Sequence, residues 1–216
     1  MTILADAKEK WSGAVNTLVL GATSKDGGTR TATVTVGGAT GVPFLRFDGA
    51  TPHRPVVAIE IWDREPEDWP APLTPAWGTA EKSPTEWARK AVEEAGADLL
   101  CLKLAGTHPD FGNRSPDEAA ATVRSVLKAV GVPLVIWGCD NEERDNEVLP
   151  RCSQAAAGER CLLAAATEGN YKTLVASCQA DGHALLGLSP IDINIAKQIN
   201  ILVSEMGFPL DRVIMY

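Results

Sequence analysis

Short apolar runs alternate with amphipathic stretches along most of this chain. The amphipathic stretches carry apolar residues at helical spacing and cover residues 83–96, 115–131, 171–182 and 193–207. The apolar runs are Val56–Trp62, Asp98–Leu104, Val132–Gly138, Cys161–Thr167, His183–Ser189 and Arg212–Tyr216. Consecutive apolar positions suit strands that are buried on both faces. Strands alternating with helices predict a parallel sheet with right-handed crossovers.

Two of the predicted helices have well-marked ends. Ser83 and Ser115 each precede a proline and stand three residues before a glutamate, which is the pattern of a capping box. Gly96 and Gly131 follow the same two helices, and we predict that they form left-handed carboxyl-terminal caps.

Residues 16–37 precede the repeating pattern and hold two β-rich runs on either side of Lys25-Asp26-Gly27-Gly28. An Asp-Gly pair between such runs predicts a β-hairpin. We expect this hairpin to cover the bottom of the repeating region. The pattern therefore divides the chain into an N-terminal extension with a β-hairpin, residues 1–55, and a repeating region, residues 56–216.

The choice between an open sheet and a barrel decides where a site would lie. An open sheet that binds a nucleotide shows a glycine-rich turn after an early strand, whereas Asp63-Arg64-Glu65-Pro66 follows the first run. The six units share 216 − 55 = 161 residues. That is about 27 residues each, close to the spacing of a barrel that needs roughly 250 residues for eight units. We therefore predict an α/β fold: a TIM (β/α)8 barrel, truncated after about six strands.

In such barrels the functional side chains lie on the loops that follow the strands. These loops are rich in Asn, Asp, Ser and Thr, and the candidate ligand-binding residues are Thr107, Asn113, Asp140, Asn141, Thr167, Asn170, Ser189 and Asp192. Hydrogen-bonding side chains without a strong nucleophile, base or metal cluster indicate recognition of a large polar ligand across the barrel mouth. We therefore predict no catalytic residue and no metal ligand.

Several polar and aromatic residues admit two interpretations. Lys103 lies in a predicted strand, where it could form a Schiff base, as in barrel aldolases, or extend between strand and helix. Residues 142–145 have the composition of a solvated helix start. Asn and Asp in the candidate set could equally cap helices and form turns. Trp69 and Trp77, in a long proline-rich loop, could form a contact surface or pack that loop onto the body.

The net charge of −8 and the pI of about 4.9 argue against binding to nucleic acid or to an anionic membrane surface. The N-terminus has no long apolar core after a basic start, and no stretch approaches the roughly 20 apolar residues of a membrane span. We therefore expect a cytoplasmic protein. The five cysteines include no C-x-x-C pair, which argues against an iron–sulfur or zinc site on this chain.

Several segments together resemble one known family: GATSKDGGTRTATVTVGG, PFLRFDG with PHRPVVAIE, ATEGNYKTL and SPIDINIAKQINILVSEMGFPLDRVIMY. They are similar to the small subunit of the corrinoid iron–sulfur protein, whose archaeal counterpart is the delta subunit of the acetyl-CoA decarbonylase/synthase complex. The similarity covers nearly the whole chain. Family members continue past the sixth strand with a PTTGALGYG-like segment that completes the barrel, so we expect this chain to be truncated.

The resemblance implies a barrel related to methyltetrahydrofolate methyltransferases. It implies a heterodimer with a large corrinoid iron–sulfur subunit, which would carry the [4Fe–4S] cluster and most contacts to cobalamin. This chain would cover the cobalamin with its barrel mouth, as a methyl carrier without catalytic residues of its own. The chain lacks the D-x-H-x-x-G segment that usually supplies a histidine ligand beneath cobalt.

The resemblance also implies further partners and a pathway. The heterodimer would receive a methyl group from methyltetrahydrofolate through a methyltetrahydrofolate methyltransferase. It would then deliver the group to carbon monoxide dehydrogenase/acetyl-CoA synthase in the reductive acetyl-CoA (Wood–Ljungdahl) pathway. The alternative is a stand-alone TIM-barrel enzyme, either a pterin-dependent methyltransferase or a Schiff-base lyase that uses Lys103.

Overall fold

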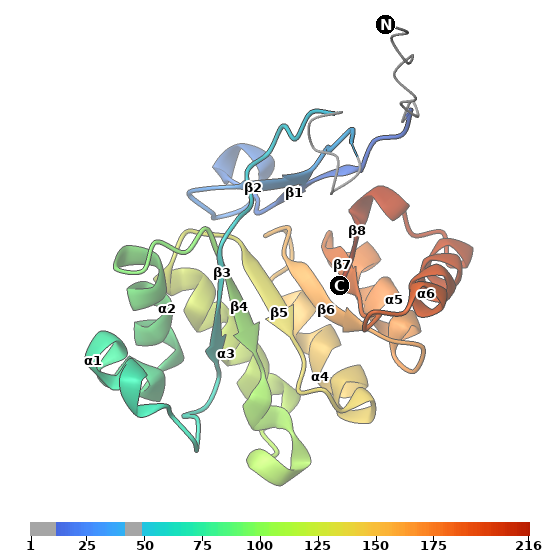
Figure 1. Ribbon diagram of the computed structural model, residues 1–216. Helices are drawn as coiled ribbons and strands as arrows, with labels where there is room; N and C mark the ends of the chain where they lie inside the picture. The colour runs from blue at the N-terminus through green and yellow to red at the C-terminus, as the bar shows by residue number, and fades with distance from the viewer. Residues whose placement is uncertain (1–11, 42–48) are drawn as a thin grey trace, which may run out of the picture.

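The computed structural model describes residues 12–41 and 49–216, and its core is a six-stranded parallel sheet (Figure 1). The strands lie side by side in chain order: β3 (Ala58–Trp62), β4 (Leu99–Lys103), β5 (Leu134–Trp137), β6 (Leu162–Ala166), β7 (Ala184–Gly187) and β8 (Val213–Met215). Each predicted apolar run contains one of these strands. The six strand predictions and the parallel sheet are therefore confirmed.

Helices fill the connections between the strands: α1 (Thr74–Trp77), α2 (Pro84–Glu93), α3 (Pro116–Ala129), α4 (Glu142–Ala155), α5 (Tyr171–Asp181) and α6 (Ile193–Glu205). Right-handed crossovers between neighbouring parallel strands place these helices on one face of the sheet. Each helix from α2 to α6 contacts the next one along the chain, so they form a continuous outer layer. Within the described ranges, no helix is long and apolar enough to cross a membrane.

One of the two predicted capping boxes is present. At the start of α3, the Ser115 hydroxyl accepts a hydrogen bond from the Glu118 N–H at 3.3 Å, and the Glu118 carboxylate accepts one from the Ser115 N–H at 2.8 Å. The prediction for Ser83 is wrong, because its side chain makes no capping bond to α2. Its hydroxyl lies instead 3.1 Å from the hydroxyl of Thr85.

Side chains alternate along each strand and give the sheet two apolar faces. On the outer face, Ile61, Leu102 and Ile136 pack with the helices and are completely buried. The opposite, inner face packs against the N-terminal hairpin through Leu20, Val34, Leu99, Val135, Leu162, Ala184 and Leu186. The hairpin therefore covers part of the inner face of the sheet.

The predicted hairpin is present, with β1 (Thr17–Leu20) antiparallel to β2 (Val34–Gly37). The Asp26-Gly27 pair does not by itself form the connection between the two strands. Ser24–Asp26 form a short 3-10 helix, because the Asp26 carboxylate accepts hydrogen bonds from the backbone and hydroxyl of Thr23 at 3.3 and 3.0 Å. The two strands are therefore joined by a long structured loop.

This loop docks on the sheet at the amino-terminal ends of the strands (Figure 1), as expected from the sequence. The Gly21 N–H donates to the Arg160 carbonyl, and the Thr31 N–H donates to the Gly131 carbonyl, both at 2.9 Å. A Cβ on Gly131 would lie 2.0 Å from the Thr31 hydroxyl. Gly131 is thus needed for close approach of the loop. The prediction that it forms a left-handed helix cap is wrong, since α3 ends in extended backbone at Val130.

A buried ion pair fastens the same loop. Arg30, which is 4% exposed, donates from Nε to Glu159 Oε2 at 2.9 Å. Its guanidinium also donates to the carbonyls of Leu127 at 2.6 Å and Val130 at 2.7 Å, at the end of α3. The Thr29 hydroxyl donates to the other Glu159 oxygen at 2.8 Å. Because both charges are fully hydrogen-bonded, the pair can be buried without an uncompensated charge.

The six-stranded sheet is open. Within residues 12–41 and 49–216, β3 bonds only to β4 and β8 only to β7, so both are edge strands. Closure into a barrel is therefore not confirmed. The structure establishes an α/β fold with a six-stranded parallel sheet and a separate two-stranded hairpin. The division of the chain at residues 55 and 56 stays a prediction.

Candidate functional site

Three side chains stand side by side where neighbouring strands end. Trp62 of β3 is in register with Lys103 of β4, and Lys103 is in register with Trp137 of β5. Neighbouring strands lie about 4.8 Å apart, so residues at one level are close neighbours. Successive side chains of a strand point to opposite faces of the sheet. The residues just before these three in sequence are buried under the helices, so these three point toward the inner face. We call them the indole–lysine row.

Two carboxylates hold the row in place. Asp140, in the loop after β5, accepts hydrogen bonds from Trp137 Nε1 at 2.9 Å and from Lys103 Nζ at 2.5 Å. Its backbone is left-handed, with φ of 65°, which Asp adopts more readily than most residues. Glu60 accepts a hydrogen bond from Trp62 Nε1 at 2.7 Å. Both indole N–H groups are therefore satisfied, and the positions of the rings are fixed.

The pairing of Lys103 with Asp140 decides the charge of both groups. Burial raises the pKa of Asp140, but the hydrogen bonds from Lys103 and Trp137 outweigh burial and hold that pKa below its usual value. Burial lowers the pKa of Lys103, but the hydrogen bond and charge of Asp140 outweigh it and hold the pKa above its usual value. Lys103 is therefore a cation and Asp140 an anion at neutral pH.

A pocket of about 330 Å³ lies beside the row. Arg64 lies over the ring of Phe111, 5.2 Å from its centroid, and pairs with Glu67 at 2.5 Å. The pocket is lined by Trp62, Arg64, Pro66, Glu67, Asp68, Lys103, Ala105, His108, Phe111, Cys139 and Asp140. It therefore combines aromatic walls with paired charges at the carboxyl ends of β3, β4 and β5.

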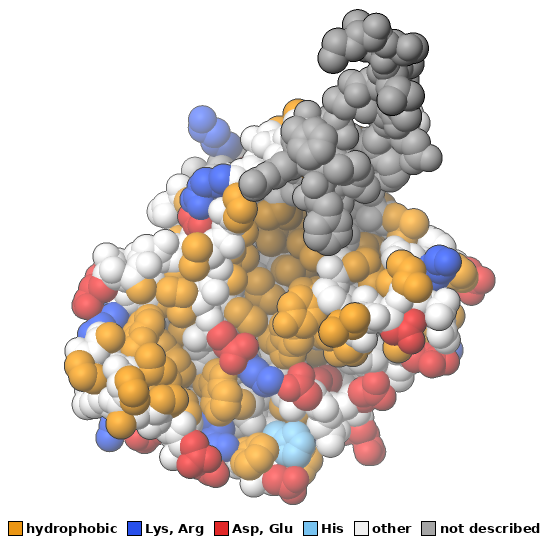
Figure 2. All heavy atoms as spheres, in the orientation of Figure 1, with side chains coloured by type: hydrophobic (Ala, Val, Ile, Leu, Met, Phe, Trp, Pro, Cys, Tyr) orange, Lys and Arg blue, Asp and Glu red, His pale blue; other side chains and the backbone are white. Residues whose placement is uncertain are grey.

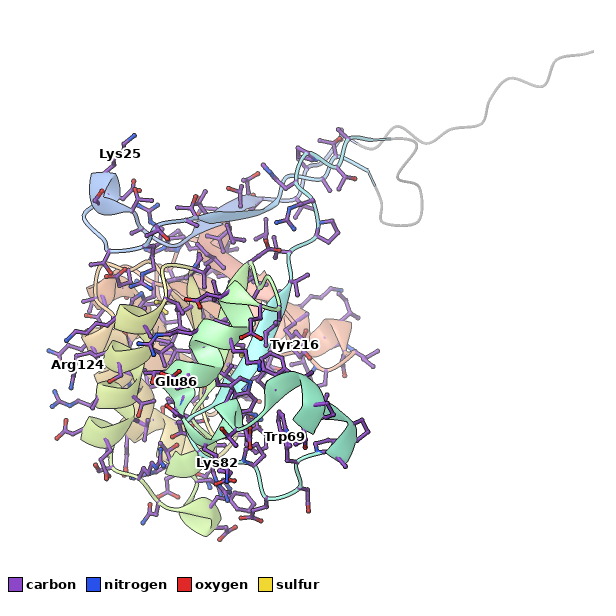
Figure 3. All side chains as sticks on the ribbon, turned by 90° about the vertical axis from the view of Figure 1, so that its left-hand side faces the viewer. Lys25, Trp69, Lys82, Glu86, Arg124 and Tyr216 are labelled. Carbon is purple, nitrogen blue, oxygen red and sulfur yellow. The ribbon has the colours of Figure 1, made fainter. Side chains whose placement is uncertain are left out.

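A second hollow, of about 320 Å³, shares Trp62 and Asp68 with this pocket and also contains Glu60. Trp69 meets the ring of Trp87 edge to face at 5.4 Å, and it lies beside α2 (Figure 3). Trp69 and Trp77 both pack onto the outer apolar layer and both line this hollow. The packing of the proline-rich loop onto the body is therefore confirmed, and its role as a contact surface stays a prediction.

The inner face between the row and the hairpin is a hollow of mainly hydrophobic side chains, with acidic and basic side chains along its lower rim (Figure 2). Cys101, Leu188 and Ile214 are partly buried there. Tyr216 is 70% exposed and meets the ring of Trp137 edge to face at 5.6 Å. The inner face is therefore apolar in the deepest part of the hollow and polar near the carboxyl ends of the strands.

Two further carboxylates are buried near the carboxyl ends of the strands, one directly after β3 and one in the first turn of α4. Asp63 accepts a hydrogen bond from the Gly106 N–H at 2.7 Å, and burial raises its pKa. Asp145 is 4% exposed and accepts one from the Cys139 N–H at 2.7 Å; burial raises its pKa as well. The interpretation of residues 142–145 as a solvated helix start is therefore wrong at Asp145, which joins α4 to the end of β5.

Four of the predicted site residues use their polar groups within their own loops. Thr107 is completely buried and donates to the Leu104 carbonyl at 2.7 Å. Asn141 caps α4 by accepting from the Arg144 N–H at 3.0 Å. Asn170 is 2% exposed, and its amide bonds to the Thr167 N–H at 2.8 Å and the Ala165 carbonyl at 3.0 Å. Asp192 caps α6 by accepting from the Asn194 N–H at 2.8 Å.

The other four are exposed or partly exposed. Asn113 is an exposed turn residue with left-handed backbone. The Thr167 hydroxyl donates to the Glu142 carboxylate, and the Ser189 hydroxyl donates to the Tyr216 carbonyl at 3.1 Å. Of the eight predicted residues, the structure places Asp140 in the pocket beside the row. Their roles toward a ligand stay predictions.

Sequence reasoning missed most of the row. Trp62 and Trp137, with Glu60 beside them, lie inside apolar runs, for which the pattern predicts strands and no further role. Neither interpretation of Lys103, as a Schiff-base nucleophile or as a side chain extended between strand and helix, predicts its ion pair with Asp140. A usable signal was present, because a tryptophan ends the first run, a tryptophan is the next-to-last residue of the third, and a lysine is the next-to-last residue of the second. Parallel strands bring such positions together at one edge.

The cysteines do not form a metal-binding group. Burial raises the pKa of the thiols of Cys101, Cys152, Cys161 and Cys178 to about 12. These four thiols are therefore protonated at neutral pH. In the described part of the chain, no three His, Cys, Asp or Glu side chains gather as a metal site would require.

These features define a parallel α/β protein whose candidate ligand-binding groups, aromatic rings and paired charges, gather where the strands end. Residues 18–216 match the family model described as CO dehydrogenase/acetyl-CoA synthase delta subunit. The chain belongs to this family, as the resemblance of its sequence segments predicted.

The names of similar proteins agree with the family assignment. The chain is 38% identical over 210 residues to the acetyl-CoA decarbonylase/synthase complex subunit delta of Archaeoglobus fulgidus, covering 96% of this chain and 46% of the relative. It is 35% identical over 208 residues to the subunit of the same name from Methanocaldococcus jannaschii, covering 96% of this chain and 51% of the relative. The chain therefore spans about half the length of these relatives.

Proposed function

We propose that this chain is the subunit that covers cobalamin in a cytoplasmic methyl-carrier assembly of the acetyl-CoA pathway. The observation that carries the proposal is the indole–lysine row with Glu60 and Asp140, because it places a fixed recognition surface at the carboxyl ends of the strands. Ligands of parallel α/β proteins bind at that end. Family membership supports the same role, since relatives are named as subunits of the acetyl-CoA decarbonylase/synthase complex.

The residues at the mouth fit a cobalamin in their chemistry. A corrinoid is a broad ring with amide-bearing side arms, and it needs apolar or aromatic contact with hydrogen-bond acceptors around the rim. Trp62 and Trp137 supply aromatic surface, and Glu60, Asp68 and Asp140 supply acceptors. When bound, cobalamin would supply the cobalt that accepts and releases the methyl group. The residues of this chain would hold the ring and limit access of water to it.

The [4Fe–4S] cluster fits this chain poorly. Its cysteines are dispersed over separate elements, and four of them have strongly raised pKa values. We therefore place the cluster, together with most cobalamin contacts, on a large corrinoid iron–sulfur subunit that forms a heterodimer with this chain. Methyltetrahydrofolate methyltransferase and carbon monoxide dehydrogenase/acetyl-CoA synthase would be the partners that give and receive the methyl group.

Barrel closure belongs to the same proposal. Two further strand–helix units beside β3 and β8 would pair both edge strands and complete a TIM barrel around the inner face. The mouth would then be a ring, of which the indole–lysine row is one arc.

The alternative of a Schiff-base lyase is disfavoured by the same geometry. A nucleophilic lysine must be neutral, and such lysines have lowered pKa values. Asp140 instead holds the pKa of Lys103 above its usual value. A pterin-dependent methyltransferase acting alone stays the second candidate, because the pocket beside the row has the size and aromatic walls for a bicyclic ring.

Anaerobic co-purification tests the proposal. The chain is expressed with an affinity tag in the presence of the candidate large subunit, and cobalt and iron are measured in the eluate. We expect a larger protein carrying a corrinoid and iron to elute with the chain. Turnover of methyltetrahydrofolate with free cobalamin by the chain alone would support the stand-alone enzyme instead. A partner without any corrinoid would contradict the carrier role.

A further inference from the structure

Lys103 lies between two carboxylates on the inner face. Asp140 is at 2.5 Å on the side of β5. On the other side stands the Glu60 carboxylate of β3. Burial raises the pKa of Cys101 and Asp140 raises the pKa of Lys103 against the effect of burial, and the charge of Glu60 adds to both increases. Glu60 and Cys101 are in register on neighbouring strands, one level below the row. The centre of the mouth therefore carries two negative charges around one positive charge.

Hydrogen-bond acceptors are in excess around this centre. Glu60 uses one oxygen for Trp62 and has a second oxygen available. Asp68 lines both the pocket and the hollow, is exposed, and makes no hydrogen bond to any other described residue. The two cations that line the pocket, Lys103 and Arg64, are already paired with Asp140 and Glu67. An approaching group therefore meets free acceptors and neutralised cations.

We propose that Glu60 and Asp140 are specificity-determining residues that select ligand arms ending in uncharged amides and reject arms ending in carboxylates. The inference rests on the proposed function, because the side arms of cobalamin end in primary amides. An amide N–H can donate to the Glu60 oxygen that Trp62 does not use. Asp140 acts differently: it holds Lys103 in an ion pair, so this cation is not available to a carboxylate arm. A carboxylate arm brings a like charge to both carboxylates, and like charges in proximity repel. Rejection of the wrong group by repulsion is a general route to specificity.

Two corrinoids without a nucleotide loop provide the test, namely cobinamide with amide arms and cobyrinic acid with carboxylate arms. Binding of each at pH 7 is measured by equilibrium dialysis on the full chain, alone and in complex with its partner subunits. We expect cobinamide to bind at least about tenfold more tightly, equivalent to about 1.4 kcal/mol. Added salt should narrow this ratio, because it screens the repulsion.

The variants are Glu60→Gln and Asp140→Asn, each of which removes one negative charge while keeping a side-chain acceptor for the indole. Each variant should reduce the preference for cobinamide over cobyrinic acid several-fold, mainly because cobyrinic acid binds more tightly. Asp211→Asn is the matched control, because Asp211 is exposed and precedes β8 at the opposite end of the sheet. Thermal unfolding of all variants confirms that each one is folded.

The outcomes separate the inference from the function on which it rests. Equal binding of the two corrinoids, or a ratio that neither variant changes, would overturn the selectivity while leaving the carrier role intact. If Asp211→Asn reduced the preference for cobinamide as much as Glu60→Gln or Asp140→Asn does, the effect would be due to net charge. That result would also overturn the proposal. Failure of both corrinoids to bind to the chain and to its complex would overturn the proposed function itself.

Discussion

At the scale of single residues, His183 is a neutral side chain built into the core. It is completely buried before β7, where Nδ1 accepts a hydrogen bond from the Cys161 N–H at 3.2 Å and Nε2 faces the Ser153 carbonyl at 3.0 Å. Only the tautomer with the proton on Nε2 satisfies both partners. A second proton on Nδ1 would face the Cys161 N–H. Burial accordingly lowers the pKa of His183 below its usual value of 6.5.

We predict a loss of stability on acidification that depends on His183. Below pH 6.5 the unfolded chain binds a proton that the native chain does not, so the free energy of unfolding falls as pH falls. The slope approaches about 1.4 kcal/mol per pH unit until the native pKa is reached. Urea unfolding at pH 7.5 and pH 5.5 should show a fall about 1 kcal/mol larger for the wild type than for His183→Asn.

The partly exposed His53 provides the control for this comparison. His53→Asn should retain the wild-type pH dependence. An identical pH dependence of the wild type and His183→Asn would mean that His183 is protonated in the native protein, in conflict with its two hydrogen bonds.

For single residues, the sequence predicted well which polar side chains lie on the loops after the strands. It predicted less well what each of these side chains does. Asn141 and Asp192 cap helices, and Asn170 holds the loop after β6, because these side chains satisfy backbone groups that would otherwise be buried without partners. The residues that form the mouth lie within strands, and their contacts depend on the register between strands. A single sequence gives the face of each residue but not the register.

At the scale of elements, the strands and most helices follow directly from the apolar pattern. Each strand is buried by helices on the outer face, so tertiary packing and local pattern agree. The hairpin strands were also predictable, but the turn was not. Asp26 was available to bond with Thr23, and this contact, rather than the Asp-Gly pair, determines the loop.

We predict that the two serine-proline helix starts differ in stability. Ser115→Ala removes the hydroxyl from the capping box of α3 and should lower the free energy of unfolding by about 1 kcal/mol. Ser83→Ala is the matched control, because Ser83 also precedes a proline but makes no capping bond to α2. Chemical denaturation of both variants provides the measurement. A larger effect of Ser83→Ala would contradict the assignment of the capping box to α3.

At the scale of the whole molecule, the open side of the sheet is flanked by exposed apolar side chains. Ile191, Ile193, Ile195 and Ile201, on and just before α6, are at least 38% exposed. β8 bonds to β7 on one side and has no strand neighbour among the described residues on the other, and α6 contacts β7. Apolar side chains beside an unpaired strand edge promote association between chains. The isolated chain should therefore self-associate.

We predict that Ile193→Glu with Ile201→Glu shifts the isolated chain toward the monomer. The added charges remove the apolar patch without touching the buried side of α6, which is formed by Ile199 and Val203. Light scattering after size-exclusion chromatography measures the mass. Asn194→Glu with Gln198→Glu adds the same charge at exposed positions of the same helix and should change the mass less. Equal effects of the two double variants would assign association to net charge instead of the patch.

The ion pair between Arg30 and Glu159 has a consequence for synthesis of the chain. The two residues are 129 positions apart in sequence. At a translation rate of about 5–20 residues per second, Arg30 leaves the ribosome roughly 6 to 26 seconds before its partner. During that interval the apolar side of the hairpin, with Leu20 and Val34, lacks the part of the inner face that β6 and β7 supply. We therefore expect a ribosome-associated chaperone to bind the exposed apolar residues of the nascent hairpin. It would release the hairpin once β6 has emerged.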